Sequence, residues 1–93
     1  MVVGVAEVEI SLPGAQSLKD KRRVIKSLLE RCRNRWNLSA AEVRDNDLWQ
    51  RAVLGLAVVA NEPEHCHQVL QAAVRFLESD PEALVASVHI SML

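Results

Sequence analysis

The strongest candidates for chemistry lie in residues 17–35, where eight lysines and arginines stand against two acidic residues. Each residue of an α-helix turns by about 100°, and five of the basic residues fall within an arc of about that width. These residues are Lys19, Arg22, Arg23, Lys26 and Arg33. Such a stripe of cations can bind successive phosphates of a nucleic acid. The alternative is a solvated helix face whose aliphatic stems cover the edge of the core.

The rest of the chain offsets this basic segment, because the formal net charge of all 93 residues is −1. A nearly neutral chain weakens the case for nucleic-acid binding. It does not remove the case, since charges act over about 8 Å at physiological salt and a basic face has a local field. The competing hypothesis is a protein–protein adaptor or structural dimer, in which the basic helix meets acidic protein and no nucleic acid.

No metal or cofactor site is predicted from the histidines and cysteines. His65 and His67 flank Cys66, but side chains two positions apart on a helix point about 200° away from each other. The two histidines therefore cannot converge on one ion, as metal ligands must. Cys32 and Cys66 each fall on an apolar helix face, which is typical of buried, reduced thiols.

Three other side chains have structural interpretations. Lys21 lies at the rim of the apolar helix face, where its ammonium either snorkels to the solvent or pairs with a carboxylate such as Glu42. Pairing is favoured, because a partly buried ammonium needs a partner. Trp49 is expected to plug the root of a hairpin, with a stacking platform as the alternative. His89 is expected to form a surface pair with a glutamate on the neighbouring strand. No nucleophile or oxyanion donor accompanies these groups, so no catalytic residue and no enzymatic activity are predicted.

The elements that position these residues follow from hydrophobic periodicity. Alternation with a period of two predicts strands, and an apolar stripe repeating every three to four residues predicts helices. The alternation slips within the second strand, which indicates a bulge or an edge position. The order is strand, helix, strand, strand, helix, strand, at residues 2–12, 18–35, 37–44, 52–60, 63–79 and 84–92.

This order predicts one α+β domain over residues 1–93 with the ferredoxin-like βαββαβ fold. Four strands form an antiparallel sheet, and both helices cover one of its faces. The other face has no helix to cover it, and a contiguous apolar patch of that kind usually marks an interface. We expect a homodimer through this open face, with the candidate residues Val3, Val5, Val53, Val59 and Val85.

The composition is that of a folded globular domain, with 49% hydrophobic and 25% charged residues. No basic leader precedes the first strand, and no apolar run approaches the roughly 18 residues that span a bilayer. The expectation is therefore a cytoplasmic protein that makes no membrane contact.

Four short segments carry a resemblance to a known family. They are Ser-Leu-Lys-Asp-Lys-Arg at 17–22, Asn37, Ala-Glu-Val at 41–43, and Trp-Gln-Arg-Ala at 49–52. In these segments the chain resembles the bacterial YlxP-like family, a domain of unknown function with a ferredoxin-like fold. The resemblance implies a translation-linked role, since genes of that family often neighbour translation and transcription factors. Ribosomal RNA or a translation-related protein is then the expected partner, and the family provides no catalytic residues to carry over.

Overall fold

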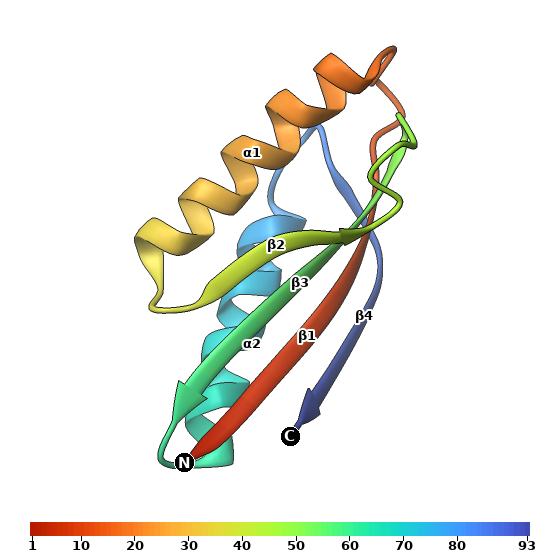
Figure 1. Ribbon diagram of the computed structural model, residues 1–93. Helices are drawn as coiled ribbons and strands as arrows, with labels where there is room; N and C mark the ends of the chain where they lie inside the picture. Colours follow the sequence, from red (N-terminus) through yellow and green to blue (C-terminus); the bar gives the residue numbers. More distant parts are fainter.

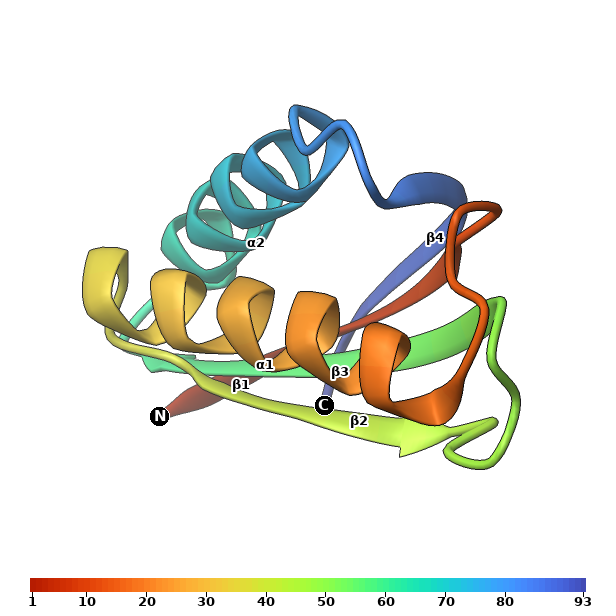
Figure 2. The same ribbon diagram turned by 90° about the horizontal axis from the view of Figure 1, so that it is seen from above.

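A computed structural model describes residues 1–93 of the chain. The strands join in the order β2-β3-β1-β4, and every neighbouring pair is antiparallel. Both helices lie on one face of this sheet (Figure 1, Figure 2), which confirms the predicted ferredoxin-like α+β fold. The elements are β1 (Val2–Ser11), α1 (Leu18–Arg35), β2 (Ser39–Arg44), β3 (Arg51–Ala60), α2 (Pro63–Glu78) and β4 (Leu84–Met92).

The local sequence explains how α1 begins and which face it buries. Ser17 caps the helix, and its Oγ accepts a hydrogen bond from the Asp20 backbone N–H at 3.1 Å. The buried apolar side chains of α1 follow a helical stripe that ends at Cys32. This stripe packs on the sheet near β2, so the opposite side of α1 remains exposed with its basic residues.

The core lies between the sheet and the two helices. It takes the even-numbered residues of β1 and β3, such as Val8 and Leu54, together with the apolar stripes of both helices. Cys32 and Cys66 have no exposed surface and form no disulfide, as the sequence predicts. Burial raises the pKa of the Cys32 thiol, although the neighbouring arginines act in the opposite direction.

Both thiols are expected to resist a disulfide reagent in the folded protein, because a buried thiol must be exposed by unfolding before it can react. Labelling should therefore proceed at the rate of global or local unfolding, and it should be complete at once in denaturant. Reaction of either cysteine within seconds under native conditions would contradict the packing of Cys32 and Cys66.

Two register shifts bend the edges of the sheet. One interrupts the pairing of β2 with β3 between Glu42 and Arg44, so β2 is both an edge strand and irregular, as its slipping alternation indicates. The other lies in the pairing of β1 with β4, where Glu9 faces Ser87 but Ile10 faces Val85. The one extra residue in β4 shifts the alternation of its side chains by one position. Odd-numbered residues of β4 therefore lie on the open face after the shift and on the core face before it.

This second shift corrects the prediction for Val85. Strict alternation with His89 and Ser87 would put Val85 on the open face of the sheet. Because the register shifts between Glu9 and Ile10, Val85 instead lies opposite Ile10 and packs against the core under the helices. The expectation that Val85 lies on the open face is wrong.

Candidate nucleic-acid interface

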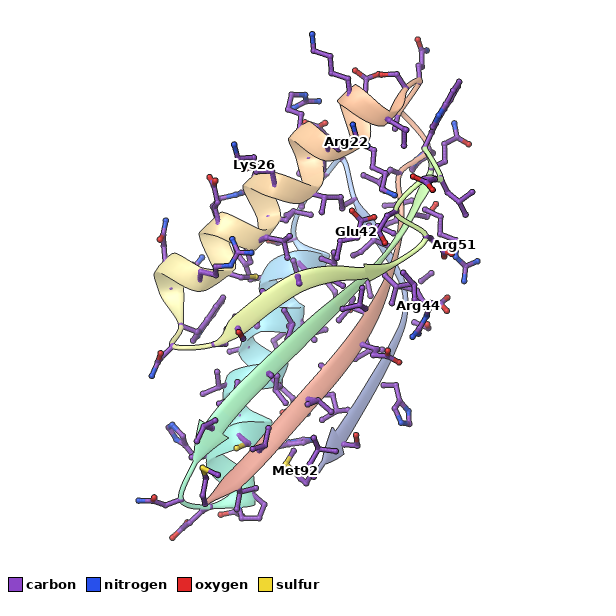
Figure 3. The ribbon with its side chains drawn as sticks, in the orientation of Figure 1. Arg22, Lys26, Glu42, Arg44, Arg51 and Met92 are labelled. Carbon is purple, nitrogen blue, oxygen red and sulfur yellow. The ribbon has the colours of Figure 1, made fainter.

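A groove runs between α1 and the edge strand β2. Arg22, Lys26 and Arg33 line it from the helix, and we call it the basic groove. Its volume is about 390 Å³, and Ile25 and Leu29 form its floor. Figure 3 labels Arg22 and Lys26 on α1 and Glu42 on the neighbouring strand.

Helix geometry places these cations in one row. Arg22, Lys26 and Arg33 are separated by four and seven residues, so they share one face of α1. At a rise of about 1.5 Å per residue, the row extends for roughly 16 Å from Arg22 to Arg33. Lys19 is exposed one turn before Arg22 and extends the row toward the start of the helix without lining the groove.

The charges of this row are not neutralised by ion pairs. No carboxylate lies within 4.0 Å of the cationic nitrogens of Lys19, Arg22, Lys26 or Arg33. The Arg33 guanidinium donates a hydrogen bond to the Ala40 carbonyl oxygen at 2.7 Å, which fixes it against β2 but leaves its charge uncompensated. Glu30 also lines the groove and Glu42 is paired with Lys21, so the three cations leave the groove with a net positive charge.

Arg23 does not join this row. Its guanidinium NH2 group lies 2.9 Å from Glu82 Oε2, in the segment between α2 and β4. The hydrogen bond from Arg23 and the charge of Glu82 together raise the pKa of Arg23. The structure thus brings four of the five candidate cations together and directs the fifth to another surface.

Lys21 holds β2 and the following turn against α1. Its side chain has no exposed surface, and its Nζ lies 2.7 Å from Glu42 Oε2 and 2.6 Å from the Asp45 carbonyl oxygen. Glu42 Oε2 is itself buried and accepts no hydrogen bond, so the charge of this ammonium is what compensates it. Asp45 has a φ of 61°, a left-handed conformation that its carbonyl contact helps to hold. The predicted Lys21–Glu42 pair is confirmed, and it positions one wall of the basic groove.

The open face of the sheet contains the other candidate residues. Val3 and Val5 are half-buried there, and Val59 is 61% exposed. Val53 also points to this face, but it lies between Glu9 and Arg44 in the sheet register and is only 1% exposed. Val53 therefore offers no surface to a partner.

An ion-pair network crosses the same face near Val53. Arg44 donates two hydrogen bonds to Glu7, at 2.8 and 3.1 Å, and these bonds lower the pKa of the Glu7 carboxyl. Arg51 lies 3.1 Å from Glu9 Oε1 and 2.8 Å from Asp45 Oδ2. His89 lies opposite Glu7 in the register, as predicted, but no ion pair within 4.0 Å joins them, because Glu7 is bound by Arg44.

Trp49 and the two histidines of α2 lie at the surface. Trp49 does not plug the hairpin, because its side chain is 52% exposed and lies outside the core, so that interpretation is wrong. His65 and His67 are exposed on either side of the buried Cys66, and no group of three potential metal ligands occurs in the chain. None of the helices is long and apolar enough to cross a membrane.

The fold and the basic groove define a small ferredoxin-like domain with a cationic helix. Residues 3–90 match the family model DUF503, described as a protein of unknown function, and the chain belongs to this family. It is 38% identical over 81 residues to the uncharacterized protein YlxP of Bacillus subtilis (strain 168), covering 87% of this chain and 88% of the relative. The resemblance inferred from the short segments is confirmed.

A solved structure supports the fold independently of the family. The solution NMR structure of a de novo designed protein with a ferredoxin fold, LFR1 1, superposes with a TM-score of 0.57 at 14% identity. The match covers 99% of this chain and 85% of the designed chain. At this identity the likeness establishes the architecture alone.

Proposed function

We propose that this domain is a non-enzymatic binding module that holds RNA by its phosphates in the basic groove. The observation that supports the proposal is the row formed by Lys19, Arg22, Lys26 and Arg33, in which no cation has a carboxylate partner. A polyanion neutralises such a row and releases its own counterions, which is the main source of sequence-independent nucleic-acid affinity.

The floor of the groove favours RNA over an acidic protein. Ile25 and Leu29 lie at the bottom, but both are buried against the core and expose almost no apolar surface. A protein partner gains much of its affinity from burying apolar anchors in pockets. This groove provides charge without such anchors, and charge alone is sufficient for a phosphate backbone.

The proposed contact does not read bases. Phosphate contacts position a protein on a nucleic acid, whereas sequence is read by contacts to base edges or by stacking. Single-strand readers with this fold stack bases on aromatic residues of the open sheet, and none of the four strands contains Phe, Tyr or Trp here. Binding is therefore expected to vary little with RNA sequence.

The groove also lacks the groups that an active site needs. No histidine, cysteine or serine lines it, and Glu42 is engaged by Lys21. Glu30 is an exposed carboxylate in the same lining, but no nucleophile accompanies it there. A general base or nucleophile would have to come from one of these residue types and lie close to the bound phosphate. A binding role is thus the function that these side chains support best.

Salt dependence tests the proposal. If four cations neutralise phosphates, log K for single-stranded RNA should fall with log salt at a slope of about −3, at roughly 0.7 per contact. Changing Arg22 and Lys26 together to glutamine should flatten the slope by about 1 to 1.5 and weaken binding similarly for all sequences. Fluorescence anisotropy over a salt series measures both effects.

Arg23→Gln is the matched control, because Arg23 sits on the same helix but outside the groove. It should leave the slope unchanged, and neither variant should alter the thermal stability, since exposed charges contribute little to folding. A wild-type protein without salt-sensitive RNA binding, or a double variant with the wild-type slope, would exclude the RNA proposal and leave the protein adaptor as the better reading.

A further inference from the structure

The open face of the sheet is divided into an apolar half and a charged half. The charged half is the ion-pair network of Glu7, Glu9, Arg44 and Arg51. The apolar half lies toward the start of β1 and the end of β3 and consists of Val3, Val5, Ala41, Val43, Ala57 and Val59. The face is the lower side of the sheet in Figure 2, where no helix covers it.

The apolar half contains a hollow. Small residues form its floor, namely Ala41, Gly55 and Ala57, and its volume is about 380 Å³. Gly55 has no side chain to fill the hollow, and a Cβ at this position would lie only 2.8 Å from Val43 Cγ1. Val5 and Val43 form part of the rim, so the hollow is lined mainly by apolar groups.

A protruding side chain stands beside this hollow on the same strand. Val59 is 61% exposed and lies two residues after Ala57, so both point to the open face. Together with Val3, its partner in the register, Val59 extends the apolar half away from the ion-pair network. An interface between two identical chains related by a twofold axis uses the same patch of both copies, so an apolar half can face its own copy.

We propose that the open face binds a second copy of this chain, with the apolar half of each copy packed on that of the other. A twofold axis parallel to the strands places the apolar halves against each other and the charged halves against each other. The interface lies on the side of the sheet opposite the helices, so it is independent of RNA binding in the basic groove.

The area of the face fits such a dimer. With a rise of about 3.4 Å per residue and about 4.8 Å between strands, the four strands present roughly 600 Å². Interfaces of standard size bury about 800 Å² per partner, and transient ones bury less than about 600 Å². The face is therefore large enough for a reversible dimer whose population depends on concentration.

The charges on the face favour a second copy over a polyanion. Glu7 and Glu9 are paired with Arg44 and Arg51, so the charged half has no excess of positive charge to attract phosphate. Two such halves can approach without net repulsion, and the arginine of one copy can reach the glutamate of the other. Like charges facing one another would instead cost affinity.

Sedimentation equilibrium tests the dimer. The weight-average mass of the wild type should rise from 10.4 kDa toward twice that value as concentration increases from about 10 μM to about 1 mM. Val59→Asp should hold the mass at that of one chain, because it places a charge between the two apolar halves. Ala57→Gln is a second variant with the same expected result, since its longer polar side chain would keep the two halves apart.

Leu48→Asp is the matched control. Leu48 is also a largely exposed aliphatic residue, at 49%, but it lies in the β2–β3 turn, so this variant should associate like the wild type. Circular dichroism verifies that all variants are folded. A wild type that keeps the mass of one chain overturns the proposal, as does Val59→Asp or Ala57→Gln associating normally, or Leu48→Asp dissociating.

Discussion

Replacement of Lys21 by methionine is expected to lower the free energy of unfolding by about 3 kcal/mol, the largest effect of any single change considered for this chain. Methionine fills a similar volume but removes the ammonium that lies 2.7 Å from Glu42 Oε2. The Glu42 carboxylate would then be an unpaired charge in a nearly dry site. The cost is set at the low end of the range for broken buried pairs because Glu42 is 14% exposed and can recover some hydration.

The loss of charge pairing accounts for most of this effect. The Asp45 carbonyl oxygen also loses Lys21, but it keeps the hydrogen bond from the Leu48 backbone N–H at 3.1 Å. Glu42 Oε2 has no such second donor. The double variant Lys21→Met with Glu42→Leu should therefore recover most of the stability, since replacing both partners of a buried ion pair by apolar groups is often neutral.

Urea denaturation of the four proteins of this cycle measures the effect as a shift of the midpoint at constant m-value. Lys19→Met is the surface control, since Lys19 lies two residues away on the exposed side of α1, and its change should stay within about 0.5 kcal/mol. If Lys21→Met lowered the free energy of unfolding no more than Lys19→Met does, the ion pair would not be holding β2 to the helix.

The fold and the basic row were predictable because each depends on spacing within one element. A period of two marks β1 and β3, and a period near 3.6 marks α1 and α2, whatever their tertiary neighbours are. The same periodicity aligns Arg22, Lys26 and Arg33, since the distance between them along the helix is fixed by its rise. The Lys21–Glu42 pair was predictable because burial of an ammonium requires a carboxylate, and β2 provides one.

The features that the sequence did not reveal depend on distant partners. Arg23 falls at the margin of the basic arc, and its direction is decided by Glu82, which lies 59 residues away. Val85 changes face because β4 contains a register shift opposite Glu9 and Ile10, and nothing in the composition of β4 marks it. Trp49 is exposed because the β2–β3 turn is held by Lys21 and Arg51 through Asp45, and so does not require its ring for packing.

Substitution of Gly4 by alanine is expected to destabilise the domain by about 2 kcal/mol. Gly4 lies on the core side of β1, where an added Cβ would be 2.8 Å from Cys66 Cβ and 3.1 Å from Leu70 Cδ1 on α2. Overfilling a packed core costs about 1 to 3 kcal/mol. Alanine also has less backbone entropy than glycine in the unfolded chain, and this difference offsets less than about 1 kcal/mol of the packing cost.

The position of the clash explains why relaxation cannot remove it. Met92 Cε would lie 3.2 Å from the new Cβ, but a long, flexible side chain can move away. Cys66 Cβ is attached directly to the backbone of α2, so relief requires the helix to shift from the sheet. Gly4 has no positive φ, and its requirement is therefore space beneath α2 rather than backbone conformation.

Gly14→Ala separates these two effects. No atom lies within 4 Å of a Cβ at Gly14, and Gly14 also has no positive φ. Alanine there should be neutral or stabilising by up to about 1 kcal/mol, through the unfolded state alone. Comparison of the two variants by urea denaturation isolates the close approach of β1 and α2. If Gly4→Ala were as stable as Gly14→Ala, α2 would not be packed this tightly on β1, and the burial of Cys66 between the helix and the sheet would lose its main support.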